Sequence, residues 1–368
     1  MKCDFSFGRR VSIVLIAFSL AGSLAGQTAP PKLPITAPKL SEEAFKNIQT
    51  LKGIPAEQLI PAMQLISFSL GVECSFCHVE GALEKDDKKP KQTARKMMQM
   101  MVAINQANFD GMRKVTCYSC HRGSTRPVNT PSAEVETPPS TDYVVPQVDQ
   151  ILTRHVDAIG GSQAIEKLTS RVEKGHVTLA GRQFPIEIFS KVPGKRLSVI
   201  HLPNGDSVTA YDGMSGWTSS ANRPVRAIPS TDMASARLEA DLQLPLHLKQ
   251  LFSELKADTP EKIGDRAVYV ISAFHAGELA AKFYFDQNSG LLFRLLRYVN
   301  SPLGQNPTQI DYADYRERDG VKMPFLVTIS RFRSRLLIQI DEANNNVPVN
   351  DAKFICPSDS ATDKPSFP

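Results

Sequence analysis

The chain has 368 residues, which is more than one typical domain and predicts two folded units of about 100 to 200 residues each. Hydrophobic residues make up 42% and charged residues 22% of the sequence, so the composition excludes wholesale disorder and a multi-span membrane protein. The formal net charge is only +5 at pH 7, and we therefore expect no nucleic-acid partner.

The amino terminus has the pattern of an export signal. Arg9 and Arg10 precede an apolar run over residues 11–25 that ends in small residues. An uncleaved membrane anchor is the alternative, but the run is shorter than the about 20 residues that a membrane-spanning helix needs. The pattern predicts a signal peptide over residues 1–25 and a periplasmic protein that is soluble or peripherally bound to the membrane.

Two proline-rich stretches divide the rest of the chain. The first is a leader over residues 26–42, and the second is a linker over residues 127–146. They predict a small first domain at residues 43–126 and a larger second domain at residues 147–356, followed by a tail at residues 357–368.

The first domain is expected to be all-α. Apolar residues recur at helical spacing just before Gly71 and again over residues 92–106. The first set is Leu59, Met63, Ile66 and Leu70, and the second is Met97, Met100 and Ile104. A cysteine motif follows each of these predicted helices.

The second domain is expected to be β-rich and antiparallel. It opens with a predicted helix over residues 147–168, broken at Gly160-Gly161, and a longer helix is predicted over residues 233–256. Turn signals separate runs of strand-forming residues, which favours a meander with one or two helices on one face. The predicted strands are 172–179, 183–191, 196–201, 207–211, 267–274, 279–286, 291–299, 308–316, 324–333 and 336–342. The fold class is therefore multi-domain α+β.

Four of the six cysteines form two copies of one motif, Cys-x-x-Cys-His. The first copy contains Cys74, Cys77 and His78, and the second contains Cys117, Cys120 and His121. On one helical turn, two thiols at this spacing can form thioethers with the two vinyl groups of a haem, and the next residue can place its imidazole under the iron. The sequence therefore predicts two covalent c-type haems, each with a histidine ligand.

Two other chemistries use paired cysteines. A structural zinc site is one alternative, but the spacing between the pairs is long and zinc would leave both histidines unexplained. Dithiol redox pairs or disulfides are the other, and they also leave the histidines without a role.

The sixth iron ligand decides whether a haem carries electrons or reacts with a small molecule. Met63 lies on the predicted helix before the first motif and can reach the opposite face of that haem. The candidates for the second haem are Met97, Met98, Met100 and Met101. Methionines at helical spacing also serve as apolar packing, and the two roles are compatible.

Residues 45–127 resemble one half of the photosynthetic reaction centre cytochrome c subunit family. Besides the helix-turn-motif arrangement, the resemblance rests on Asp86-Asp87-Lys88, on Ala94-Arg95-Lys96-Met97, on Ile104-Asn105 and on residues 115–123. In that family a methionine on the helix before the motif usually supplies the sixth ligand, and one haem has two histidine ligands. The resemblance therefore implies Met63 with His78 for the first haem and Met100 with His121 for the second, with Met101 as the alternative to Met100.

The family implies an electron carrier and not an enzyme, with redox proteins, a membrane-bound electron-transfer complex or a reaction centre as partners. The family's subunit has four haems, whereas this chain has two motifs. A dihaem peroxidase-like enzyme with one open iron is an alternative from a different functional class.

The second domain is similar to periplasmic lipoprotein-carrier proteins. The similarity lies in Tyr211-Asp212-Gly213, Phe283-Tyr284-Phe285-Asp286 and residues 319–325 and 346–350. It implies an open antiparallel half-barrel that holds an apolar ligand. A lipid-binding or lipoprotein-binding module with a redox-sensing cytochrome domain is thus a third functional hypothesis. The other histidines are interpreted as structural or surface residues, namely His155, His176, His201, His247 and His275.

Overall fold

The computed structural model describes residues 39–130, 145–221 and 223–357. The predicted signal peptide lies outside the described residues, as do most of the leader, the linker and the tail. Among the described helices, none combines the length and the apolar composition that are needed to cross a membrane.

The first part of the described chain is helical, as predicted. Its elements are α1 (Ser41–Ala44), the 3-10 helix η1 (Ala56–Gln58), α2 (Leu59–Leu70), α3 (Cys74–Cys77), α4 (Lys89–Asn108) and α5 (Cys117–His121). Helix α2 ends at Gly71, which adopts the left-handed conformation with φ 67°. Helix α4 begins three residues before its predicted start, because Pro90 fits the first helical turn, where no backbone donor is required.

Helices α2 and α4 share an apolar core. Met98 and Met101 lie on one face of α4 and pack with the buried face of α2, which includes Leu59, Ala62 and Leu65. Their spacing of three residues places both side chains on the same side of the helix. The remaining methionines of α4, Met97 and Met100, are exposed in the protein chain alone.

The second part is an antiparallel sheet with helices. The described strands are β1 (Ser170–Leu179), β2 (Arg182–Lys191), β3 (Lys195–Leu202), β4 (Gly205–Tyr211), β5 (Gly216–Ser220), β6 (Arg223–Ala227), β7 (Glu254–Ile263), β8 (Arg266–His275), β9 (Glu278–Asp286), β10 (Leu292–Ser301), β11 (Gly304–Arg318), β12 (Val321–Arg331) and β13 (Ser334–Asn345). The helices are α6 (Val148–Ala158), α7 (Ser162–Glu166), α8 (Ser230–Ala240) and α9 (Leu244–Leu251), and the 3-10 helix η2 (Asp351–Phe354) follows the last strand.

All 13 described strands form one open sheet, in the order β6-β5-β4-β3-β2-β1-β13-β12-β11-β10-β9-β8-β7. The chain first runs outward from β1 to β6. It then crosses through α8 and α9 to the opposite edge at β7 and returns strand by strand to β13, which pairs with β1. The fold class predicted from the sequence, α+β with an open antiparallel sheet, is confirmed.

The prediction of one long helix in the second part was wrong. Residues 233–256 do not form a single helix: α8 ends at Ala240, α9 starts at Leu244, and residues 254–256 belong to β7. Pro245 explains the break, because proline cannot lie in a helix interior and here occupies the first turn of α9. Strand β7 escaped prediction because it is polar and contains Pro260, which an edge strand tolerates.

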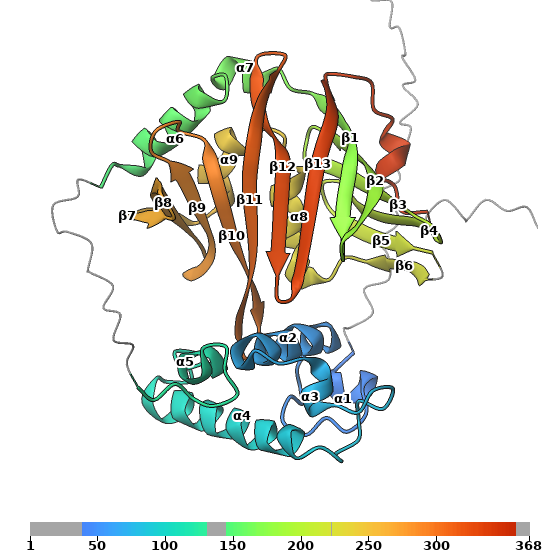
Figure 1. Cartoon of the computed structure of the whole chain (residues 1–368), viewed down its shortest axis with the longest axis vertical. Helices are drawn as coiled ribbons and strands as arrows, with labels where there is room; N and C mark the ends of the chain where they lie inside the picture. The colour runs from blue at the N-terminus through green and yellow to red at the C-terminus, as the bar shows by residue number, and fades with distance from the viewer. Residues whose placement is uncertain (1–38, 131–144, 222, 358–368) are drawn as a thin grey trace, which may run out of the picture. The chain divides into compact units, whose positions relative to one another are not determined.

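The helices cover one face of the sheet. Ile151 and Leu152 of α6 and Leu248 of α9 are buried with the aromatic side chains Phe283 and Phe285 of β9. Figure 1 shows α8 and α9 behind the strands of the sheet. A second apolar cluster lies where β1 and β2 meet β12 and β13, so the core continues across the β1–β13 pairing.

Candidate functional site

The first cysteine motif forms a single helical turn. Cys74 and Cys77 are the first and last residues of α3, and the backbone N–H of His78 donates to the Cys74 carbonyl at 2.9 Å. His78 itself is extended, so its ring leaves the helical turn. Its Nδ1 lies 2.7 Å from the Leu83 carbonyl oxygen. A carbonyl can only accept, so Nδ1 carries the proton and Nε2 keeps its lone pair for a metal.

The second motif also forms a short helical turn, but here the histidine is the last residue of the helix. Helix α5 carries Cys117, Cys120 and His121, and its start is capped by Thr116 and Ser119. The Nδ1 atom of His121 lies 2.9 Å from the Ser124 carbonyl oxygen. The same reasoning leaves the Nε2 atom of His121 free to bind iron.

A cavity of about 500 Å³ opens beside the first motif. Cys74, Cys77 and His78 line it together with Met63 of α2. Lys91 and Arg95 of α4 also reach its wall. The structure therefore brings together all four residues that the sequence assigned to the first haem.

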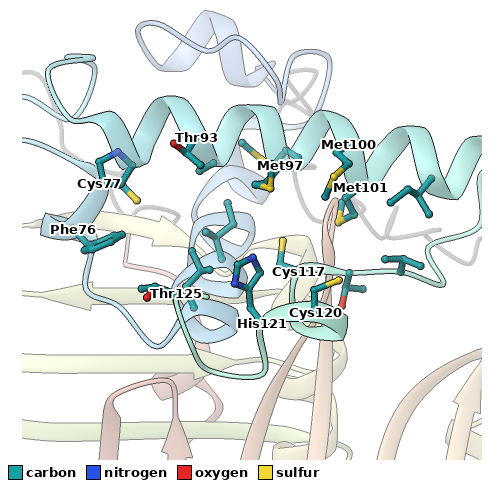
Figure 2. A pocket seen from close by; sticks show the side chains of 18 of the residues that line it. Phe76, Cys77, Thr93, Met97, Met100, Met101, Cys117, Cys120, His121 and Thr125 are labelled. Carbon is teal, nitrogen blue, oxygen red and sulfur yellow. The ribbon is translucent and has the colours of Figure 1, made fainter. Parts of the chain in front are cut away.

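A cavity of about 350 Å³ adjoins the second motif. It is lined by Cys117, Cys120 and His121 and by four methionines of α4, namely Met97, Met98, Met100 and Met101. In Figure 2 the labelled methionines project from α4 toward Cys117, Cys120 and His121. Both cavities lie within the range of about 300 to 1,000 Å³ that is typical of cofactor sites, and their walls are largely apolar.

Exposure separates the two leading candidates for the sixth ligand of the second haem. Both border the cavity, but Met101 is 6% exposed and packs into the core between α2 and α4, whereas Met100 is 48% exposed. A side chain that already fills the core is less available for an iron than one that faces open space. Met97, which is 40% exposed, shares this feature with Met100.

The two cavities share part of their lining. Ile66 of α2, Cys77 of α3 and Ala94 and Met98 of α4 border both of them. Two groups bound in these cavities would therefore be separated by a wall one side chain thick.

The four motif cysteines form no disulfide with one another in the described structure. Cys74, Cys77, Cys117 and Cys120 are free cysteines, and burial raises the pKa of the Cys77 and Cys117 thiols. No group of three or more His, Cys, Asp or Glu side chains in the described part of the chain could hold a metal ion. Cys77 borders the same cavity as Cys117 and Cys120, but these described side chains do not form the cluster that a zinc site shared by the two pairs would require.

A charged network next to His78 was not anticipated from the sequence. Lys91 donates to the Leu83, Glu84 and Lys85 carbonyl oxygens and pairs with Asp86 at 3.0 Å. Hydrogen bonds from Arg95, together with Lys91, hold the pKa of Asp86 well below its usual range. The only signal in the sequence was the clustering of opposite charges between the motifs.

The histidines of the β-rich part are used structurally. His155 is buried against Phe285 and bonds to the Gly290 carbonyl oxygen. His176, His201 and His247 each contact an aspartate, respectively Asp341, Asp206 and Asp241.

Comparison with known proteins agrees with the motif assignment. The profile of the photosynthetic reaction centre cytochrome C subunit family matches residues 21–160. The photosynthetic reaction center cytochrome c subunit of Roseobacter denitrificans is 32% identical over 111 residues, which cover 27% of this chain and 30% of that protein. The subunit of Thermochromatium tepidum is 32% identical over 101 residues, covering 26% and 25%. The chain thus spans less than a third of the length of these curated relatives.

The solved structures that match are of proteins with other names than the curated relatives. A putative outer membrane lipoprotein-sorting protein domain from Vibrio parahaemolyticus aligns with 56% of this chain and 94% of its own, at 11% identity and a TM-score of 0.40. The LolA superfamily protein NE2245 from Nitrosomonas europaea aligns with 56% and 97%, at 11% identity and a TM-score of 0.40. Residues 21–160, which contain both Cys-x-x-Cys-His motifs, are similar to the photosynthetic reaction centre cytochrome c subunit family.

Proposed function

We propose that this chain is an extracytoplasmic dihaem c-type cytochrome that carries electrons between redox partners. One observation supports the proposal above all others. Each Cys-x-x-Cys-His turn borders its own apolar cavity, with a histidine whose Nδ1 is engaged by a carbonyl and with methionines on a different helix. Thiols for attachment and two axial ligands are the complete requirement for an electron-carrying c-type haem.

Each residue has a defined task in this proposal. Cys74 and Cys77 hold the first haem, and Cys117 and Cys120 hold the second. A bound haem supplies an iron that cycles between the ferrous and ferric states. His78 with Met63 would bind the first iron and His121 with Met100 the second, which would leave no open site for peroxide or oxygen.

The wall shared by the two cavities supports transfer inside the protein. Cys77 and Met98 border both cavities, so electrons need to cross only one layer of side chains.

The partners follow from the relatives by analogy. The matched curated proteins are named as subunits of photosynthetic reaction centers, so a membrane-bound electron-transfer complex is included among the proposed redox partners. The β-rich part is proposed to dock a partner or to hold an apolar ligand.

The proposal is tested on the full chain produced with a haem-attachment system. We expect a pyridine haemochrome assay and an intact mass that both correspond to two haems per chain, and a low-spin spectrum in both oxidation states. Met63→Ala and Met100→Ala should each turn one haem high-spin. Met214→Ala serves as the control, because this methionine is 87% exposed in the β-rich part.

Two results would contradict the proposed function, and a third would change only one assigned ligand. A colourless protein or a protein with bound zinc would refute haem attachment. A high-spin haem in the unmodified protein would favour a peroxidase-like enzyme. Conversion by Met97→Ala or Met101→Ala in place of Met100→Ala would correct the axial ligand and leave the electron-carrier function intact.

A further inference from the structure

The backbone carbonyl that orients His78 is shared with a buried cation. The Leu83 oxygen lies 2.7 Å from Nδ1 of His78 and 2.9 Å from Nζ of Lys91. Lys91 is only 9% exposed, and it also donates to the Glu84 and Lys85 carbonyl oxygens at 2.8 Å. The ammonium group therefore sits directly behind the first axial histidine.

The second motif lacks this arrangement. Nδ1 of His121 lies 2.9 Å from the Ser124 oxygen, and among the described residues no other donor is bonded to that oxygen. Both histidines thus have an Nδ1 that is hydrogen-bonded to a backbone carbonyl, and they differ in whether a cation shares that acceptor.

This difference has a predictable electronic effect. A carbonyl that accepts strongly from Nδ1–H increases the electron donation of the imidazole, which favours ferric iron. Lys91 draws electron density from the Leu83 oxygen and so weakens this effect at His78. Its positive charge in a poorly solvated position also disfavours the extra charge of ferric iron. Both contributions raise the reduction potential.

The surrounding charges do not cancel this effect. Asp86 pairs with both Lys91 and Arg95, so this group of three carries one net positive charge. The side chains of Lys91 and Arg95 are well buried, which limits screening. Lys46, Glu73 and Glu84 also line the first cavity, but Lys46 and Glu73 are exposed and Glu84 is partly exposed, so water and salt screen their charges more than those of Lys91 and Arg95. Lys89 borders the second cavity but is exposed, as is Arg122 after the second motif, so water and salt screen their charges.

We propose that Lys91 is a positioning residue that sets the reduction potential of the first haem above that of the second. An electron that enters at the second haem then passes spontaneously to the first, and the first haem delivers it to the acceptor. This inference rests on the proposed dihaem function. It assigns a direction of electron flow, which the two motifs alone do not indicate.

The test is a spectroelectrochemical titration of the full haem-loaded chain and its Lys91→Met variant. Methionine keeps the length of the side chain and removes the charge. We expect the reduction equilibrium constant of one haem to fall about tenfold, which equals about 59 mV for a one-electron couple. The other haem should keep its potential. The Met63→Ala variant, whose altered spectrum marks the first haem, identifies which wave has moved.

Two further variants make the result decisive. Lys96→Met removes a positive charge from the exposed side of the same helix and should leave both waves in place. Asp86→Asn keeps Lys91 and removes the compensating carboxylate, so it should raise the reduction constant of the first haem. This variant decides the matter if Lys91→Met fails to fold.

The inference is overturned if Lys91→Met shifts neither reduction potential more than Lys96→Met does. It is also overturned if Lys91→Met shifts both potentials equally, or if it shifts the potential of the second haem. A shift in the same direction for Lys91→Met and Asp86→Asn would also overturn it. Absence of any reduction wave would instead refute the proposed function itself.

Discussion

His155 shows how burial alone changes the chemistry of a side chain. It lies in α6 with 4% of its surface exposed, and its Nδ1 is 3.0 Å from the Gly290 oxygen. Burial lowers the pKa of His155 to about 4, and the hydrogen bond to Gly290 only partly opposes this effect. Over the pH range between this lowered pKa and the ordinary pKa of histidine, the imidazole is therefore neutral in the folded protein and charged in the unfolded chain.

A pH dependence of stability follows from this residue. Between about pH 6.5 and pH 4 the unfolded chain binds a proton that the folded chain does not, so the free energy of unfolding falls as the pH falls, by up to about 3 kcal/mol. His155→Asn keeps a donor for Gly290 and should remove this contribution to the slope. Urea titrations at several pH values, followed by the fluorescence of the single tryptophan, Trp217, measure it.

The control is His275→Asn, which changes an exposed histidine at the end of β8. It should keep the pH dependence of the unmodified protein. An unchanged slope in His155→Asn would show that carboxylates alone cause the loss of stability in acid.

At the scale of elements, the end of α2 and the loop after the second motif are joined through two glycines. The N–H of Gly123 donates to the Ser69 carbonyl oxygen at 2.8 Å. A Cβ atom on Gly71 would lie 2.3 Å from the Gly123 oxygen, and Gly71 also has a positive φ of 67°. The helix that carries Met63 is thereby held against the loop that follows His121.

We expect Gly71→Ala to lower the free energy of unfolding by at least about 2 kcal/mol, because a left-handed alanine costs about 1 to 2 kcal/mol and the backbone contact adds to it. Gly53→Ala is the matched control, since Gly53 has a φ of 77° but a Cβ atom there would meet no other atom within 4 Å. Chemical unfolding followed by haem absorbance compares the two. Equal losses would mean that the Gly123 contact has no energetic role.

At the scale of the whole molecule, the pairing of β1 with β13 joins the two halves of the sheet. Thr178 pairs with Leu337, and Arg171 pairs with Asn345, so each contact spans more than 150 residues of sequence. Gly175 lies at the register shift in β1, and a Cβ atom there would be 2.0 Å from the Gln339 carbonyl oxygen. Backbone atoms of β13 cannot rotate away from such a contact.

Gly175→Ala should therefore destabilise the β-rich part by at least about 2 kcal/mol, through separation of the two strands at their centre. Lys174→Ala, at the exposed neighbouring position, should change the free energy of unfolding by no more than about 0.5 kcal/mol. Urea unfolding followed by Trp217 fluorescence distinguishes them. A small effect of Gly175→Ala would show that the β1–β13 junction adapts without cost.

Features encoded by neighbouring residues were predicted correctly from the sequence. Gly71 ends α2 because glycine alone adopts φ 67° without strain, and Gly160-Gly161 separates α6 from α7 for the same reason. The ten predicted strands all overlap described strands, since alternation and turn residues are local signals. The domain boundaries and the roles of the ligand residues stay predictions.

The sequence by itself determined the local features of the candidate site: the two Cys-x-x-Cys-His turns carry their own spacing, and helical periodicity places methionines ahead of each motif. Only the tertiary structure decided which methionines of α4 are buried in the core and which are exposed, that Lys91 lies behind His78 and that β1 pairs with β13. The physical reason is distance along the chain. Thiol spacing and turn geometry depend on adjacent residues, whereas burial, shared acceptors and strand pairing depend on packing between segments that the sequence pattern does not relate to one another.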